Sequence, residues 1–206
     1  AENEPRAYDG KWPAGGGGGG TERRDDSVRT PRRDGADGHV GEQVKDFASY
    51  HRGASRETAR IVDSDGHIAF QKPGDPAGVS FTDDEVGQMR GRTLIHNHPG
   101  GRAMSSADLI ALKHMGLREI IAVRQGDGDT AVRLTPRASK MSDKEFASAV
   151  GTTDNQVFQR VWPFVKDGRV AEAVANTYHH DLVLQTLVDQ HLIEADGLKA
   201  VPQEML

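Results

Sequence analysis

Residues 93–108, TLIHNHPGGRAMSSAD, are the part of this chain that most constrains its fold. They begin with the pattern of a β-strand, continue through a Pro-Gly-Gly turn and end on serines that start an amphipathic helix. In a strand, His96 and His98 leave the same face about 7 Å apart. Asp108 falls in the first turn of the helix, where its carboxylate can fold back over the end of the strand. Strand, turn and helix thus bring three polar side chains to one place.

These three side chains form a donor set that suits a metal ion. Two neutral imidazoles and one carboxylate bind zinc and leave a fourth position open for water. Chance alone gives about 0.4 H-x-H pairs for nine histidines in 206 residues, and Ser105 with Asp108 is also a helix-capping signature. The conjunction of strand, turn and helix start favours the metal. The sequence therefore predicts a zinc site at His96, His98 and Asp108.

Composition excludes several classes of protein. The net charge of -5 and the isoelectric point near 6.0 argue against binding of nucleic acid through bulk phosphate attraction. The absence of cysteine excludes disulfides, thiolate nucleophiles and iron–sulfur clusters. No apolar run approaches the length of a membrane span or of a signal-peptide core. We therefore expect a soluble, cytoplasmic protein that does not bind a membrane.

The chain divides by composition into three parts. Residues 1–41 contain six consecutive glycines and mixed charges with almost nothing to bury, which predicts a disordered arm. Residues 42–137 alternate helical and strand patterns and predict an α/β core, with a mixed β-sheet flanked by helices. Residues 138–206 carry apolar positions at helical spacing and predict a helical C-terminal extension, which packs on the core or on a protein partner.

Turn and capping signals give the expected order of elements. The core is expected to contain a helix near residues 44–51, a hairpin of strands at 57–63 and 67–71, a helix at 83–90, a strand at 93–98, a helix from 106 to about 115, and strands at 118–124 and 130–134. The extension is expected to contain helices at 143–150, at 155–166 with an interruption at Pro163, and at 169–192.

Three pieces of the sequence together resemble a known motif: Glu57, the HNHP run at residues 96–99, and the Ser105-x-x-Asp108 pattern. They are similar to the JAMM/MPN metalloprotease motif, E … H-x-H-P … S-x-x-D, and most similar to its bacterial, RadC-like and phage-associated branches. The resemblance covers about residues 50–137. It implies a JAB/MPN-like fold with cytidine-deaminase-like layering. The loop before Ser105 is one residue shorter than in the eukaryotic deubiquitinase pattern.

The resemblance implies a role for each residue. The two histidines and Asp108 would bind Zn²⁺, Ser105 would steady the oxyanion, and Glu57 would be the catalytic acid and base. Glu85 is nearer to the histidines in sequence. A capping box explains Glu85 fully, so Glu57 is the preferred candidate.

The expected activity is hydrolysis of an amide or isopeptide bond, with a peptide or a ubiquitin-like protein as substrate. One alternative is a non-catalytic JAMM-like binding or scaffold module that recruits a protein partner through the C-terminal helices. Another is a RadC-like, DNA-associated protein, which the acidic balance of charge disfavours.

Two further patterns are interpreted structurally. Asn97 points to the strand face opposite its histidine neighbours and is expected to make structural hydrogen bonds. The run His179-His180-Asp181 is similar to a metal phosphohydrolase signature. Adjacent residues of a helix do not share a face, so no metal role is predicted there.

Overall fold

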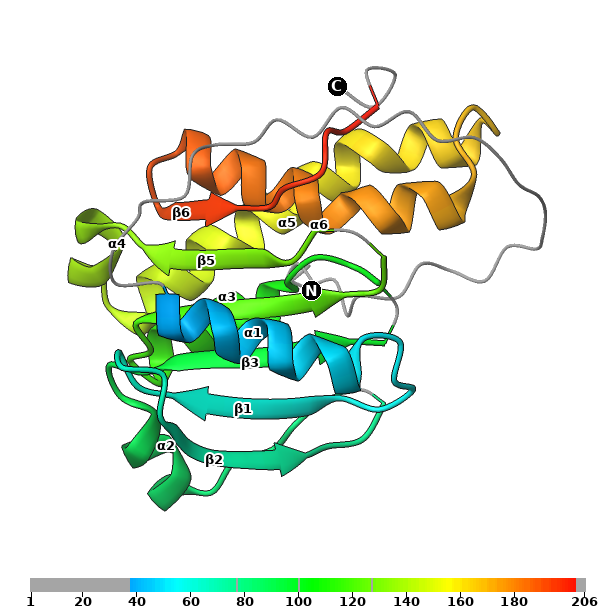
Figure 1. Cartoon of the computed structure of the whole chain (residues 1–206). Coiled ribbons are helices and arrows are strands. Elements are labelled where there is room, and N and C mark those ends of the chain that lie inside the picture. Colours follow the sequence, from blue (N-terminus) through cyan, green and yellow to red (C-terminus); the bar gives the residue numbers. More distant parts are fainter. Residues whose placement is uncertain (1–37, 77, 100, 127, 203–206) are drawn as a thin grey trace.

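Six strands form one mixed sheet in the order β2-β1-β3-β4-β5-β6 (Figure 1). This computed structural model describes residues 38–202 except 77, 100 and 127. The strands are β1 (Thr58–Val62), β2 (Ile68–Pro73), β3 (Thr93–His98), β4 (Glu119–Arg124), β5 (Thr130–Leu134) and β6 (Ile193–Asp196). β3 and β4 are parallel, whereas the other neighbouring pairs are antiparallel.

Helices cover both faces of the sheet. They are α1 (Gly38–His51), α2 (Asp83–Met89), α3 (Ser106–His114), α4 (Pro136–Lys140), α5 (Asp143–Lys166) and α6 (Glu172–Asp189). α1 crosses one face, and α3, α5 and α6 lie on the other (Figure 1). Each face has its own apolar core, one built around Phe47 of α1 and the other around Leu109 and Leu184. Burial of each such side chain stabilises the fold by about 1.5–3 kcal/mol.

The alternation of side chains along β3 sets the orientation of both histidines. Ile95 packs in the core under α1, and Leu94 packs in the core under α3, α5 and α6. Because successive side chains leave a strand on opposite faces, His96 and His98 share the face of Leu94. The sequence prediction of an α/β fold with a mixed sheet flanked by helices is therefore confirmed, and the histidines point into the layer that contains α3.

The C-terminal third differs from its expected course. α5 is one continuous helix, so the predicted break between residues 150 and 155 is wrong. Thr153 and Asp154, which lie in that break, are buried in tertiary contacts. Pro163 does not end the helix: its missing N–H removes one backbone bond, but its carbonyl still accepts from the N–H of Asp167 and the helix continues to Lys166.

Strand β6 was not predicted, and the last helix ends earlier than expected, at Asp189. β6 pairs antiparallel with β5 from Ala131↔Asp196 to Leu134↔Ile193, which adds a sixth strand to the sheet. α5 and α6 contribute to the same apolar core as β1, β3 and β4. The expected extension therefore shares its core with the sheet.

The N-terminal boundary also shifts. α1 begins at Gly38, so residues 38–41 of the expected disordered arm are helical. Residues 1–37 lie outside the described residues. Within the described part of the chain, no helix is long and apolar enough to cross a membrane.

Candidate metal site

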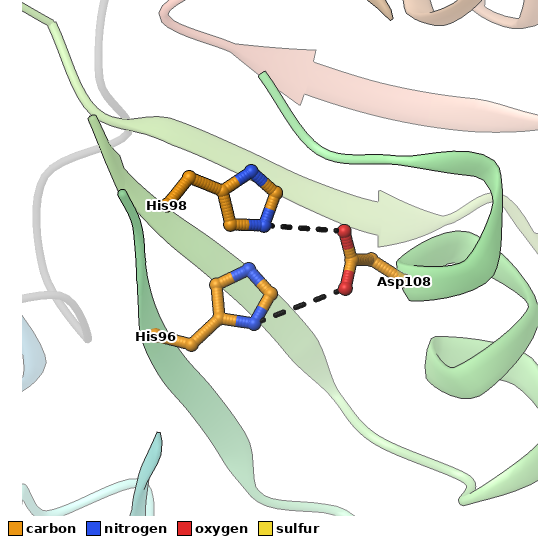
Figure 2. A group of neighbouring side chains, drawn as sticks. All are labelled: His96, His98 and Asp108. Carbon is orange, nitrogen blue, oxygen red and sulfur yellow. Dashed lines mark ion pairs between the residues drawn. The ribbon is translucent and has the colours of Figure 1, made fainter. Parts of the chain in front are cut away.

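The end of β3 presents His96 and His98 to the start of α3 (Figure 2). Their ring centroids are 4.6 Å apart, and both side chains are almost fully buried. The chain then turns at the N–H of Gly101, which donates to the carbonyl of His98 over 2.9 Å. Gly101 has φ +65°, a conformation that favours glycine. This turn reverses the chain so that α3 starts over the two imidazoles.

Asp108 faces both imidazoles from the first turn of α3 (Figure 2). Its Oδ2 lies 3.3 Å from Nε2 of His98, and its Oδ1 lies 3.9 Å from Nδ1 of His96. Ser105 is the N-cap of α3, and its backbone N–H and its hydroxyl both donate to Oδ2 of Asp108 over 2.7 Å. The S-x-x-D pattern is thus a capping box whose acidic member also faces the histidines.

The three side chains fit a metal ion. One ligand atom from each lies within 4.8 Å of the others, and donors at tetrahedral angles around zinc are about 3.3 Å apart. Nδ1 of His98 donates to the carbonyl of Ala103 over 3.0 Å, so Nε2, which faces Asp108, is the nitrogen that would bind a metal ion. Nε2 of His96 is buried and has no hydrogen-bond partner among the described residues. A buried nitrogen without a partner is costly, and a cation would satisfy it.

The charges at the site are arranged for a cation. Burial lowers the pKa of His96 to about 4, against the attraction of Asp108. Burial also disfavours protonation of His98, but a hydrogen bond to Asp108 and the negative charge of that carboxylate raise the pKa of His98 above its ordinary value. Burial would raise the pKa of Asp108, yet the two histidines and the Ser105 hydroxyl hold it well below its usual range. A buried carboxylate beside a neutral imidazole favours a bound cation.

Antiparallel pairing brings Glu57 to the same site. β1 pairs with β3 so that Ala59 lies opposite His96. Glu57 directly precedes β1, and the same register, continued by two residues beyond this pair, sets it opposite His98 and on the same face as Ala59. The backbone of Glu57 is fixed as well, since its N–H donates to the carbonyl of Asp75 over 2.9 Å.

The electrostatic environment of Glu57 differs from that of an ordinary surface glutamate. Burial raises its pKa to about 7, the positive charge of His98 lowers it, and the negative charge of Asp108 raises it. Arg102, on the loop that leads to α3, also lowers it. Glu57 is therefore electrostatically coupled to two of the three candidate ligands, and it titrates near neutral pH.

Asn97 holds the backbone on both sides of Glu57. Its Oδ1 accepts from the N–H of Thr58 over 2.7 Å, and its Nδ2 donates to the carbonyl of Arg56 over 2.8 Å. The prediction that Asn97 makes structural hydrogen bonds is confirmed. The sequence did not indicate which segment these bonds hold.

The carboxylate of Glu85 binds Lys72 and the start of α2 instead of facing the candidate metal site. Its carboxylate accepts from Nζ of Lys72 over 2.7 and 3.0 Å and from the N–H of Thr82 over 2.7 Å. The hydrogen bond from Lys72 and the backbone hydrogen bond from Thr82 lower its pKa. The predicted capping box of α2 is present, and it occupies this carboxylate.

The hydrogen bonds of Ser105 position the carboxylate of Asp108. The single hydroxyl hydrogen is donated to Asp108, and the hydroxyl oxygen accepts from the N–H of Asp108 over 3.3 Å. In this structure Ser105 therefore orients a candidate ligand. Its role as an oxyanion donor stays a prediction.

A second acidic cluster lies on the β1–β2 turn. Asp63, Asp65 and His67 bring ligand atoms within 4.8 Å of one another. Oδ1 of Asp63 accepts from the N–H groups of Asp65 and His67, both over 2.9 Å, as expected for a side chain that stabilises a turn. His67 and Asp65 are exposed, so the turn itself explains this cluster.

The sequence did not predict that three polar residues of α6, His179, His180 and Asp181, are buried near the candidate site. His179 hydrogen-bonds Asp154 of α5, and Asp181 forms an ion pair with Arg124 at the end of β4. Burial lowers the pKa of His180 to about 3, as do the positive charges of His179 and Arg102. The signal in the sequence was the run of three polar residues inside an otherwise apolar helix, which by itself does not tell which of them are buried.

Comparisons with protein-family models, with curated proteins and with solved structures find no match to this chain. Its function is therefore inferred from its own fold and geometry. The fold is α/β with a mixed six-stranded sheet, and the site is a His-His-Asp cluster that could hold a metal ion. Glu57 lies opposite one member of that cluster in the register of the sheet.

Proposed function

We propose that this chain is a zinc-dependent hydrolase of the JAMM type, which cleaves an amide or isopeptide bond of a peptide or of a ubiquitin-like protein. The observation that carries the proposal is the convergence of His96, His98 and Asp108, with Glu57 directly before the neighbouring strand β1 and electrostatically coupled to His98 and Asp108. Two histidines and one carboxylate are the protein ligands of a catalytic zinc that keeps one open position. A nearby carboxylate that is not needed as a ligand is the usual acid and base of such sites.

The residues of the chain would divide the work as follows. When bound, zinc supplies a Lewis acid that polarises the scissile carbonyl and makes water a better nucleophile at neutral pH. Glu57 accepts a proton from the attacking water and delivers it to the leaving amine. In the metal-free site burial raises the pKa of Glu57 to about 7, and a carboxylate in so desolvated a position suits an acid and base that must both lose and regain a proton. His98 is kept in one tautomer by Ala103, and Asp108 is oriented by Ser105.

Metal content tests the proposal directly. The full chain, dialysed against zinc and then against buffer, is expected to retain about one zinc per chain by elemental analysis. The variants His96→Ala and Asp108→Ala are expected to lose it, because each removes one of three protein ligands. His114→Ala is the matched control, since His114 is an exposed histidine that contacts Asp143 and lies outside the cluster.

Two results would contradict the metal site: a wild-type chain without zinc, or unchanged zinc in the His96 and Asp108 variants. Circular dichroism of each variant separates loss of a ligand from loss of the fold. Retention of zinc without cleavage of peptide or isopeptide substrates would instead favour a non-catalytic binding module. Salt-dependent binding of DNA would favour the RadC-like alternative.

A further inference from the structure

One carboxylate of α5 joins the start of α3 to the middle of α6. Oδ2 of Asp154 accepts from the hydroxyl of Ser106 over 3.0 Å, and Oδ1 lies 2.5 Å from Nε2 of His179. Asp154 and His179 are both buried. A buried carboxylate is costly unless hydrogen bonds satisfy it, so this carboxylate holds both partners firmly.

Ser106 is the first residue of α3, directly after the capping residue Ser105 and two residues before Asp108. The position of the carboxylate also suits the helix, because the unsatisfied N–H groups of a helix N-terminus attract negative charge. Any shift of Ser106 moves the turn that carries Asp108. Metal ligands must lie within about 0.2 Å of their required distances, so the placement of this turn matters for binding.

The same segment of α6 is fixed at a second point beside the site. Asp181 forms a fully buried ion pair with Arg124, and Arg124 lies opposite His98 in the parallel register of β3 and β4. α6 is thus held on one side to the strand next to His98 and on the other, through Asp154, to the helix that carries Asp108. His180 lies between these two contacts, buried, and its Nδ1 has no hydrogen-bond partner among the residues described.

We propose that Asp154 is a positioning residue of the metal site: together with His179 it holds Ser106, and thereby the first turn of α3, so that Asp108 faces His96 and His98. This inference rests on the proposed zinc site. It gives α5 and α6 a part in metal binding, whereas the sequence predicted only a module that packs on the core or recruits a partner. Partners that orient metal ligands from outside typically contribute about 10- to 100-fold to metal affinity.

Zinc affinity of the full chain, measured by competition with a chromophoric chelator, tests the inference. Ser106→Ala removes the α3 end of the link and leaves the contact between α5 and α6 intact. It is expected to weaken zinc binding by about 10- to 100-fold, and Ser106→Thr, which keeps a hydroxyl, is expected to restore it. Asp154→Asn is also expected to weaken binding, because the amide is neutral and replaces one of the two acceptor oxygens by an N–H donor, which weakens the hold on Ser106 and His179.

Thr153→Val is the matched control. Thr153 is buried next to Asp154 on α5, and its hydroxyl bonds Oε1 of Gln190 over 3.3 Å, so the variant loses a contact between the C-terminal segments without touching α3. Its zinc affinity is expected to equal that of the wild type. The absorption spectrum of the Co²⁺-loaded chain gives a second measurement, because it depends on the geometry of the ligands. The spectrum is expected to change in Ser106→Ala and to stay the same in Thr153→Val.

The outcomes that would contradict the inference are distinguishable. Wild-type affinity in both Ser106→Ala and Asp154→Asn would overturn the inference and leave the zinc site in place. An equal loss in Thr153→Val would also overturn it, because general packing of α5 would then be the cause. A wild-type chain that binds no zinc would overturn the inference together with the proposed function.

Discussion

Neighbouring residues of β3 have different roles because their side chains lie on opposite faces of the sheet. His96 points toward α3 and Asp108, whereas Asn97, one residue later, points to the other side and binds the backbone around Glu57. The strand therefore carries candidate ligands on one face and a support for the candidate base on the other. A substitution at Asn97 should separate the two functions of the site.

Asn97→Ala is expected to retain zinc and to lose activity. The variant leaves the buried N–H of Thr58 without its acceptor, which costs about 1–3 kcal/mol of stability. It also removes the hydrogen bonds that hold the backbone on both sides of Glu57. Zinc content, thermal unfolding and peptide hydrolysis would be measured together. Thr93→Val is the control, because Thr93 lies on the same face of β3 and its hydroxyl accepts from Arg118, away from Glu57. Equal losses of activity in both variants would exclude a specific effect of Asn97.

Glu57→Gln is expected to keep the metal and to lower the rate of hydrolysis by about 10²- to 10⁴-fold, the usual contribution of a general acid and base. The amide has nearly the same size but cannot take up a proton. Glu85→Gln serves as the comparison, since it weakens only the contacts to Lys72 and the cap of α2. Full activity of Glu57→Gln would remove Glu57 from the mechanism, and loss of activity in Glu85→Gln would transfer the role there.

At the scale of elements, α6 shows how a helix can be buried although its sequence contains a polar run. His179, His180 and Asp181 are all buried because α6 packs against α5 and β6 and reaches Arg124 at the end of β4. Two of them have partners on other elements, Asp154 and Arg124. Burial and the positive charges nearby lower the pKa of His180 and keep it neutral at neutral pH.

The metal-free chain is expected to lose stability on acidification partly through His180. Its pKa is lowered from 6.5 to about 3 in the folded state, so below pH 6.5 the unfolded chain takes up a proton that the folded chain does not. Stability from this group is complete above pH 6.5 and falls by about 1.4 kcal/mol per pH unit down to about pH 3. Urea unfolding of the wild type and of His180→Gln between pH 7 and pH 4 would measure the difference in slope.

The comparison with His180→Gln is needed because other groups titrate in the same range. The pKa values of Glu57 and His98 are raised, so their contributions change with pH in the opposite direction. Both groups are present in the wild type and in His180→Gln, so their contributions to the difference in stability between the two proteins cancel to first order. Parallel pH profiles of the two proteins would show that His180 does not carry the effect.

At the scale of the whole molecule, the part of the described chain that carries the candidate metal site shares one apolar core with the C-terminal helices. The apolar core that contains Leu94 and Ile120 of the sheet also contains Val157 of α5 and Leu184 of α6. β6 pairs along β5 and completes the sheet on that side. Removal of the C-terminal third would therefore expose the part of this core that α5 and α6 cover and leave only α3 on that face of the sheet.

A chain that ends at Arg137 is expected not to fold, because the face of the sheet that packs on α5 and α6 would meet water. Each fully buried large apolar side chain contributes about 1.5–3 kcal/mol, so loss of the many such side chains that α5 and α6 add to this core exceeds the stability of a typical domain, about 5–15 kcal/mol. Circular dichroism, thermal unfolding and limited proteolysis would be compared with the full chain. A cooperative unfolding transition in the shortened chain would show instead that the C-terminal helices are a true extension.

Local sequence determined the parts of the site that lie close together in the chain. The alternation of a strand puts His96 and His98 on one face, and the S-x-x-D pattern puts Asp108 in the first turn of a helix, because both geometries are set within a few residues. The general α/β class with a mixed sheet also follows from local patterns, since helical and strand periodicities alternate along the chain.

Tertiary structure decided what depends on contacts between distant segments. The pairing of β1 with β3 sets Glu57 opposite His98, and no local pattern specifies which strands pair. The continuity of α5 through Asp154 and the addition of β6 likewise follow from buried contacts with other elements. The physical reason is that the free energy of these contacts exceeds the weak local preferences for a break or a loop.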